Sequence, residues 1–490
     1  MFQPTGFSLQ IFKDRYAFNQ DETWEECCRR VSRQMALAEN PDKQKIIEEK
    51  FFDIISNNLF VPGGRILYNS GRHHPQLLNC FVLGNELDSK EGWGKITSDM
   101  IITSMTGGGC GIDFSDVRPN GADISFQRGT CPGPVALMKL IDGCAEPIRA
   151  GGQRRVALML SLFLHHPDVK EFLNAKLNNK ELIHSNISVN SRNTKEFIKA
   201  VKKDGEYELS WKNKYKTKVK AKEIWDTIVK NVYESAEPGF LNGEFANQEN
   251  TIFYISELLT SNPCGEYWIS PYEACCLGSL VLPRFIKDND LNWNLLGNTI
   301  RTAVRFLDNV ISINYYPLSE MKERSQKLRR IGLNVTGLAD MLVMLGYKYG
   351  STEANNFIDK MERFISKAAY ESSIMLAIEK GPFPLCNPKL HIQSGYVSRM
   401  TEKIKSLIEE NGIRNCAILS QAPCGTISIL SGNVSSGIEP IFAPAYERRY
   451  WVGDERRTEL VFHPLFHSMM VDEKDVNNFV SARELSIENH

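Results

Sequence analysis

Three side chains that can do chemistry together stand at alternate positions of one short segment: Asn262, Cys264 and Glu266. A thiol can supply a nucleophile or a one-electron centre, a carboxylate a general base, and an amide an anchor for a hydroxyl. Pro263 and Gly265 lie between them and disfavour a helix, so the sequence predicts a tight loop that presents all three groups to one point. The alternative is an ordinary turn with a solvated Glu266.

Further thiols follow and precede this segment. Cys275 and Cys276 come soon after it, and Cys80 lies in the middle of an apolar run that predicts a buried strand. Free cysteines are among the most buried residues, so purely structural roles are the alternative for all three.

Residues 262–266, with Pro-Tyr-Glu-Ala-Cys at 271–275 and Leu-Gly-Ser at 277–279, resemble the radical-cysteine loop of ribonucleotide reductases. The spacing is most similar to that of the adenosylcobalamin-dependent class II enzymes. The resemblance implies an α/β fold, a ten-stranded α/β barrel whose central finger loop carries Cys264. It further implies an N-terminal helical region over residues 1–60, with the barrel over residues 61–490 incomplete because its C-terminal strands are missing.

The resemblance also assigns roles. Cys264 becomes a thiyl radical that takes the 3′-hydrogen of a ribonucleotide, Glu266 removes the 3′-hydroxyl proton, and Asn262 holds the substrate. Cys80 and Cys275 match the redox-active pair that reduces the 2′-position and closes to a disulfide, which requires Cα atoms within roughly 7 Å. Cys276 stands where the family has Asn, so either of the adjacent cysteines could be the partner, and the position favours Cys275.

A second segment resembles the family's substrate-diphosphate site. Small and hydroxyl residues at a strand-to-helix junction can leave N–H groups for a phosphate, although a plain turn with a helix cap has the same pattern. Cys424 replaces the first Thr of the family's Pro-Thr-Gly-Thr-Ile-Ser. The resemblance places Gly109, in a glycine-rich turn, and Asn79 near the substrate as well. The expected substrate-binding residues are Asn79, Gly109, Pro423, Cys424, Gly425, Thr426, Ile427 and Ser428.

A third group resembles the specificity-effector site, where a deoxynucleoside triphosphate binds at a dimer interface. Asp88 and Ser89 precede a predicted helix, and Arg118 begins a loop. Arg154 and Arg155 follow a glycine pair that resembles the loop linking effector to substrate choice. Without the resemblance, the two adjacent arginines would be interpreted as a solvated pair.

The composition limits the class of protein. With 58 basic and 59 acidic residues the formal charge is −1, so no global positive field favours nucleic acid as a partner. Twelve cysteines in 490 residues indicate a reducing compartment. The sequence contains neither a signal peptide nor a membrane span, so we expect a cytoplasmic protein. His165 and His166 are adjacent and would point apart in a strand, and we predict no metal site.

The elements that position these residues follow from hydrophobic periodicity. Residues 21–58 predict two amphipathic helices, and the rest alternates short apolar runs with longer helices, as in α/β proteins. We expect strands at 77–83, 111–115, 156–164, 331–335 and 416–420, and helices at 222–235, 293–313 and 353–378. The polar stretch 174–222 is interpreted as a surface excursion with a hairpin turn at Asp204 and Gly205.

The resemblance implies adenosylcobalamin as cofactor, a ribonucleotide substrate, a dNTP effector, a homodimer and a thioredoxin-like reductant. Because no C-terminal cysteine pair is present, we expect either a second chain that supplies those cysteines and the rest of the barrel, or a truncated sequence. Two alternatives remain open. One is the large subunit of a class I reductase, which receives its radical from a metal-bearing partner. The other is a nucleotide-binding subunit without turnover.

Overall fold

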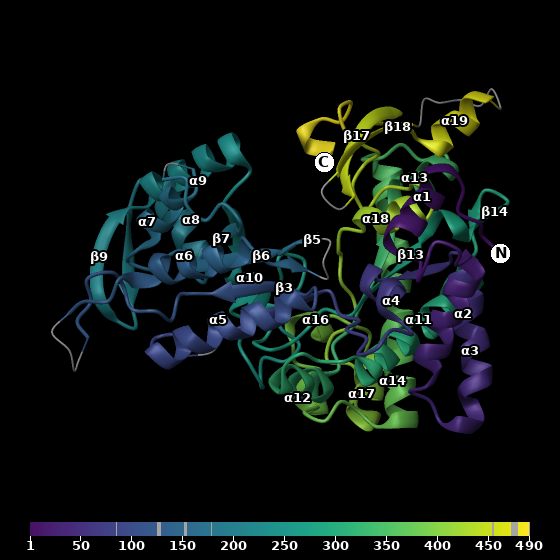
Figure 1. The fold of residues 1–490 in the computed structure, drawn as a ribbon, viewed down its shortest axis with the longest axis horizontal. Coiled ribbons are helices and arrows are strands. Elements are labelled where there is room, and N and C mark those ends of the chain that lie inside the picture. Colours follow the sequence, from purple (N-terminus) through teal and green to yellow (C-terminus); the bar gives the residue numbers. More distant parts are fainter. Residues whose placement is uncertain are drawn as a thin grey trace.

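The computed structural model describes residues 1–84, 86–124, 129–150, 154–177, 179–452, 455–471 and 479–489. The chain forms two lobes, one built on a parallel sheet and one on long helices (Figure 1). Among the described helices, none is both long and apolar enough to cross a bilayer.

Four helices open the chain: α1 (Gly6–Arg15), α2 (Trp24–Ala36), α3 (Pro41–Ser56) and α4 (Gly64–Asn69). They confirm the predicted N-terminal helical region, which extends past residue 60 to the end of α4. A capping box starts α2, because Thr23 accepts from the Glu26 amide while the Glu26 side chain accepts from the Thr23 amide. The short strand β1 (Phe60–Pro62) separates α3 from α4.

Five parallel strands form the sheet of the first lobe, in the order β10-β7-β6-β3-β2. They are β2 (Cys80–Leu83), β3 (Gly109–Asp113), β6 (Leu158–Phe163), β7 (Asn186–Ser191) and β10 (Gly239–Asn242). Strand β6 is almost entirely buried, as expected for a parallel strand covered on both faces. The connecting helices are α5 (Lys90–Met105), α6 (Gly133–Ala145), α7 (Val169–Ala175), α8 (Thr194–Lys202) and α9 (Ala221–Ser235).

A second sheet has the order β1-β13-β16, with β13 (Leu277–Val281) and β16 (Gly332–Thr336) parallel. Long helices pack around it (Figure 1). The helices of this part are α10 (Gly243–Gln248), α11 (Trp293–Ile313), α12 (Ser319–Leu328), α13 (Leu338–Met344), α14 (Thr352–Lys380), α15 (Pro388–His391), α16 (Gly395–Ser398), α17 (Glu402–Asn411), α18 (Gly425–Leu430) and α19 (Pro464–Val471), with 3-10 turns at Leu282–Phe285 and Ile487–Asn489.

The remaining strands form two-stranded antiparallel pairs. They are β4 (Arg149–Ala150) with β5 (Arg154–Arg155), β8 (Glu206–Trp211) with β9 (Lys214–Lys220), β11 (Thr260–Ser261) with β12 (Trp268–Ile269), β14 (Ile286–Lys287) with β15 (Asp290–Leu291), and β17 (Ala445–Val452) with β18 (Glu455–Phe462).

The α/β class is confirmed, and among the described residues the strands form a five-stranded parallel sheet and a separate three-stranded sheet that do not close into the expected ten-stranded barrel. Two of the predicted elements are wrong. Residues 416–420 run beside Ile331 and Leu333 with three backbone hydrogen bonds, but only Leu419 forms a strand-type bridge, to Leu333, so the segment is not a regular strand. The hairpin in 174–222 turns at Lys212 and Asn213, whereas Asp204 and Gly205 join α8 to β8. The stretch is not all surface either, since β7 lies inside the sheet with buried Asn and Ser side chains.

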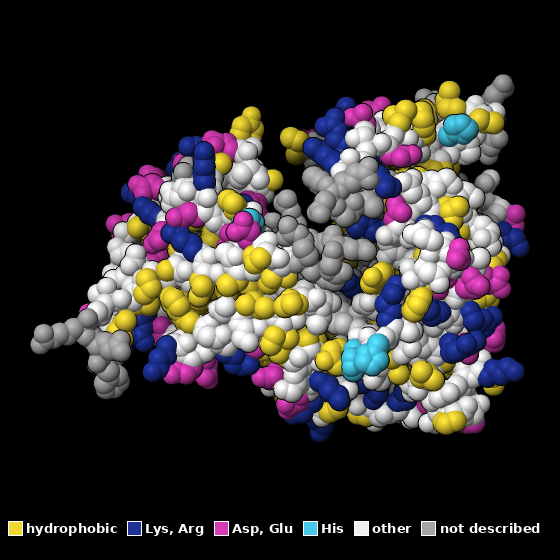
Figure 2. Space-filling view, viewed as in Figure 1, with side chains coloured by type: hydrophobic (Ala, Val, Ile, Leu, Met, Phe, Trp, Pro, Cys, Tyr) yellow, Lys and Arg dark blue, Asp and Glu magenta, His cyan; other side chains and the backbone are white. Residues whose placement is uncertain are grey.

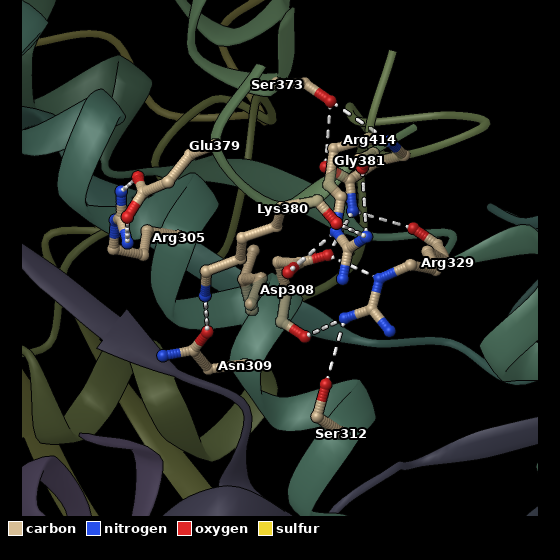
Figure 3. Close-up of polar contacts among 12 residues, drawn as sticks. Arg305, Asp308, Asn309, Ser312, Arg329, Ser373, Glu379, Lys380, Gly381 and Arg414 are labelled. Carbon is tan, nitrogen blue, oxygen red and sulfur yellow. Dashed lines mark hydrogen bonds and ion pairs between the residues drawn. The ribbon is translucent and has the colours of Figure 1, made fainter. Parts of the chain in front are cut away.

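A buried polar network fixes the helical lobe behind the second sheet (Figure 3). Asp308 on α11 is 0% exposed and accepts from Arg329 Nε at 2.8 Å, Asn415 Nδ2 at 3.0 Å and Arg414 Nε at 3.3 Å. Burial alone would raise the pKa of Asp308, but the two guanidiniums outweigh burial and lower it. Three chain segments are therefore held to one carboxylate.

The same helix anchors the N-terminal region. Glu39, between α2 and α3, accepts from Lys380 Nζ at 2.8 Å, Asn309 Nδ2 at 2.9 Å and Arg305 Nη1 at 3.0 Å. Lys380 also donates to Asn309, and Arg305 pairs with Glu379 (Figure 3). These contacts place the opening helices against α11 and α14.

Candidate active site

The finger loop, residues 260–269, is a hairpin with Cys264 at its tip. Strands β11 and β12 form its stem, and the Gly265 amide donates to the Asn262 carbonyl at 3.0 Å. Gly265 has φ +84°, a left-handed conformation that suits glycine. Asn262 organises the tip: its Nδ2 donates to Glu266 Oε1 at 2.7 Å, and its Oδ1 accepts from the Tyr267 amide at 3.0 Å. The predicted loop is therefore present, with Cys264 exposed at the turn.

The glycine-rich turn allows the finger loop to lie directly on the sheet. A Cβ at Gly111 would lie 2.0 Å from the Ser261 carbonyl oxygen, and one at Gly109 would lie 3.1 Å from Pro263 Cγ. The backbone of the finger loop therefore contacts the backbone of β3 at Gly111 so closely that only glycine fits there. The loop packs on the sheet beside β2, which begins at Cys80.

Cys80 and Cys275 lie opposite each other across an antiparallel bridge. Phe81 pairs with Ala274, and the Cys275 amide donates to the Cys80 carbonyl at 2.8 Å. Directly opposite residues of an antiparallel pair have Cα atoms about 4.5 to 5.5 Å apart and side chains on the same face. That separation lies inside the range of about 4.4 to 6.8 Å that a disulfide spans. Both thiols are free in this structure.

The neighbouring Cys276 faces elsewhere. Its Sγ donates to the Leu307 carbonyl of α11 at 3.3 Å, inside the main hydrophobic core. Adjacent residues of an extended segment point to opposite sides, so only one of the two cysteines can face Cys80. The arrangement favours Cys275 as the partner.

All three thiols of the site are held in the protonated form. Although Cys264 is exposed at the tip, the protein packed behind the turn partly desolvates its sulfur and, with the nearby Glu266 carboxylate, raises the pKa of Cys264 to about 11. Burial also raises the pKa values of Cys80 and Cys275. Ionisation of Cys80 is further disfavoured by the neighbouring Cys264, and ionisation of Cys275 by the neighbouring Cys80. A protonated thiol is a poor nucleophile but can give up a hydrogen atom or a proton. The site is therefore suited to hydrogen transfer rather than thiolate attack.

Glu266 has one satisfied and one unsatisfied oxygen. Oε1 accepts from Asn262, whereas Oε2 is buried without a hydrogen-bond partner among the described residues. Burial raises the pKa of this carboxyl above its ordinary value of 4.5. A carboxylate with an open acceptor and a raised pKa is suited to removing a proton from a ligand. A buried, unsatisfied acceptor also costs stability.

We expect Glu266→Gln to stabilise the folded chain at pH 7 to 8. The folded-state pKa of Glu266 is raised, so ionisation above pH 4.5 costs folding free energy that a neutral amide does not. The gain should disappear as the pH falls to about 4, where the carboxyl is protonated in both states. Urea unfolding at several pH values measures this difference. A variant less stable than the wild type at pH 7.5, with no trend toward pH 4, would contradict the assignment.

A pocket of about 320 Å³ opens beside the finger loop. Cys80 and Gly109 line it, and Gly109 also contacts Pro263 of the loop, so pocket and loop adjoin. Of the residues expected to bind substrate, all but one line this pocket: Asn79, Gly109, Pro423, Cys424, Gly425, Thr426 and Ile427. Ser428 turns away on α18, where its hydroxyl donates to the Gly425 carbonyl at 2.9 Å.

Two side chains that the sequence did not single out by chemistry hold the 422–427 segment in place. Asn334 Nδ2 donates to the Ala422 carbonyl at 2.9 Å and to Cys424 Sγ at 3.0 Å. Ser279 Oγ lies 2.9 Å from the same sulfur. Ser279 and Asn334 are register partners on β13 and β16 and also line the pocket. Cys424 thus fills a hydrogen-bonding role that suits the Thr of the resembling segment.

The residues expected at an effector site are only partly described. Asp88 binds Arg118 through both carboxylate oxygens, with Arg118 Nε 2.9 Å from Oδ1 and Nη2 2.9 Å from Oδ2. Ser89 caps α5 by accepting from the Gly92 amide at 2.9 Å. Residues 151–153 lie outside the described residues, and Arg154 and Arg155 are described only as the backbone of β5.

The comparisons with known proteins agree with the site. A model described as "Ribonucleotide reductase, barrel domain" matches residues 78–489, and one described as "Ribonucleotide reductase, all-alpha domain" matches residues 2–75. The chain is 34% identical to a "Vitamin B12-dependent ribonucleoside-diphosphate reductase" of Mycobacterium tuberculosis (strain CDC 1551 / Oshkosh) over 452 residues, which is 90% of this chain and 62% of the relative.

Two further relatives are informative. A Thermoplasma acidophilum protein with the same description is 36% identical over 423 residues, covering 85% of this chain and 52% of the relative. A "Ribonucleoside-diphosphate reductase subunit alpha" of Chlamydia muridarum is 29% identical over 496 residues, covering 89% and 47%. The chain therefore spans 52 to 62% of the length of the two vitamin B12-dependent relatives.

Proposed function

This chain belongs to the ribonucleotide reductase family, and from that premise we propose that it reduces ribonucleotides to 2′-deoxyribonucleotides by radical chemistry that starts at Cys264. One observation carries the proposal. Cys80 and Cys275 are joined by a backbone hydrogen bond and lie beside the Cys264 loop. Cys80 also lines a pocket large enough for part of a nucleotide.

The proposed steps balance in atoms and electrons. The Cys264 thiyl takes the 3′-hydrogen, Glu266 accepts the 3′-hydroxyl proton, and the 2′-hydroxyl leaves as water. Cys80 and Cys275 supply two electrons and two protons and join as a disulfide. Glu266 then returns its proton to the 3′-oxygen, and the hydrogen atom returns from Cys264 to the 3′-carbon. Asn262 orients Glu266 throughout, since its amide already binds one carboxylate oxygen.

Adenosylcobalamin is the cofactor that we propose, because the two relatives described as vitamin B12-dependent are the more similar ones. The exposure of Cys264 fits this assignment, since a group outside the chain can reach the sulfur. When bound, adenosylcobalamin supplies the one-electron chemistry that removes the thiol hydrogen atom. The alternative, a class I large subunit, is favoured by the likeness to the Chlamydia subunit alpha and needs a metal-bearing partner instead.

A dimer and an effector are part of the proposal. The face formed by α5 and α6 carries Ile102, Met105 and Leu140, which are 40%, 62% and 46% exposed, around a shallow apolar hollow. Figure 2 shows hydrophobic side chains gathered along this lobe. A second copy of the chain would cover them. A dNTP effector would then bind near Asp88 and Arg118, at the start of α5. A thioredoxin-like protein would reduce the disulfide. The division between the two domains, expected near residue 60, would follow α4, because the two family models divide between residues 75 and 78.

The test is a reconstitution. The chain is incubated with a ribonucleotide, dithiothreitol and adenosylcobalamin, alone and with the part of the Thermoplasma relative that it does not match. We expect deoxyribonucleotide only when adenosylcobalamin is present. Product formed with an iron- or manganese-bearing partner instead would establish the class I alternative. Nucleotide binding without product under every condition would establish a binding subunit without turnover.

A further inference from the structure

The pocket has a wall that the family's cysteine and phosphate segments do not provide. Arg15 and Tyr16 at the end of α1, and Arg65 at the start of α4, line it together with the 423–427 segment. These residues come from the N-terminal helical region and carry no local motif. The wall is nevertheless an integral part of the site, because the same hollow touches Cys80 and Gly109.

Specific contacts hold this wall in place. The Tyr16 hydroxyl is hydrogen-bonded to Thr426 Oγ1, and Ser8 Oγ donates to the Ile429 carbonyl at 2.5 Å, so α1 is fixed against α18. Arg65 Nη2 donates to the Gly107 carbonyl at 2.5 Å, which ties α4 to the glycine-rich turn. Because a guanidinium carries five N–H donors, this bond can coexist with a contact to a ligand.

The charge of the pocket is one-sided. It contains two arginines, Arg15 and Arg65, and none of the described residues that line it is acidic. Guanidiniums match phosphate oxygens in geometry and charge, and their effect is stronger in a concave site that partly excludes water. A neutral nucleoside would gain little binding affinity from this arrangement, whereas a phosphorylated nucleoside would bind more tightly through both guanidiniums.

We infer that Arg15 and Arg65 bind the phosphates of the nucleotide, so that the N-terminal helical region supplies the charge recognition of the site. The inference rests on the proposed function for the identity of the ligand. Tyr16 acts as a positioning residue, because it connects α1 to Thr426 without needing to touch the ligand. The 423–427 segment lines the same pocket and would share the phosphate site.

Binding of cytidine diphosphate and of cytidine to the full chain, measured by calorimetry, tests this inference. Arg15→Gln and Arg65→Gln should each weaken cytidine diphosphate binding by about tenfold to hundredfold, the loss expected for one charge-assisted contact. Cytidine binding should change less than about twofold. Arg15→Lys and Arg65→Lys should recover part of the loss, since they keep the charge but not the fork. Arg33→Gln on α2, whose side chain is 69% exposed, is the matched control and should bind like the wild type.

Because the two arginines lie on different helices, the test still works if one variant does not fold. Circular dichroism identifies such a variant. Unchanged cytidine diphosphate affinity in both folded glutamine variants would overturn the inference. So would a wild-type chain that binds cytidine diphosphate no more tightly than cytidine. If the arginine dependence holds but no deoxyribonucleotide forms on reconstitution, the proposed reduction fails while the phosphate site stands. If reduction occurs without arginine dependence, only the phosphate site fails.

Discussion

Cys264→Ser is expected to abolish deoxyribonucleotide formation, lowering the rate by at least about 10⁴-fold, as for the loss of a reacting side chain. An oxygen cannot replace sulfur here, because the O–H bond is too strong for the hydrogen-atom transfers proposed at this position. The loop should keep its shape, since Cys264 is exposed and its sulfur makes no hydrogen bond that supports the hairpin among those described at the tip. Product formation in the reconstituted enzyme is the measurement.

Two further cysteine variants separate the roles. Cys80→Ser should still form a radical at Cys264 but yield no deoxyribonucleotide, because the two-electron reductant is lost. Cys386→Ser, at a half-buried thiol just before α15 and outside the proposed site and dimer face, is the matched control and should keep full activity. Activity of Cys264→Ser above about one tenth of the wild-type rate would show that this sulfur does not take part in the reaction.

Asp308→Ala is expected to destabilise the fold by about 3 to 5 kcal/mol, the range for breaking a buried ion pair. The variant leaves Arg329 and Arg414 without their shared carboxylate in the interior. Urea unfolding of wild type and variant at pH 7 measures the difference. Asp359→Ala is the control, because Asp359 forms an exposed pair with Arg363 one turn along α14 and should hardly matter.

The pH dependence gives a second check on Asp308. Its folded-state pKa is lowered, so its contribution is fully present above the ordinary pKa of 3.8 and is lost as the pH falls through the folded value. The gap between wild type and Asp308→Ala should therefore be constant from pH 5 to 8 and shrink in more acidic solution. A gap that is already absent at pH 7 would mean that the network in Figure 3 contributes no net stability.

Local signals in the sequence were enough to predict the loop and the buried strand beside it, whereas the pairing of Cys80 with Cys275 came from the family resemblance. Pro263 and Gly265 exclude a helix, and the apolar run around Cys80 indicates a buried strand, so both elements followed from their own residues. Ser428 stays a prediction: its segment lines the pocket, but its own hydroxyl donates to the Gly425 carbonyl within α18 and the residue does not line the pocket.

Other parts of the site could not be predicted locally. Arg15, Arg65 and Asn334 carry no motif, and they meet only because α1, α4 and β16 converge on one hollow. Strand β7 was missed because its buried Asn and Ser side chains look like those of a surface segment. These polar side chains are tolerated in the interior because neighbouring backbone groups form some of their hydrogen bonds. For example, Asn190 Nδ2 donates to the Leu259 carbonyl at 2.6 Å.

The central claim is that Cys80 and Cys275 together reduce a ribonucleotide after Cys264 starts the reaction. Its most direct test is a single turnover of the pre-reduced, reconstituted enzyme without dithiothreitol, followed by rapid acid quench, alkylation of free thiols and peptide mapping. The account predicts one disulfide between residues 80 and 275 for each deoxyribonucleotide formed, with Cys264 and Cys276 recovered as alkylated thiols. Deoxyribonucleotide formed while Cys80 and Cys275 both remain free, or are joined to other partners, would contradict it.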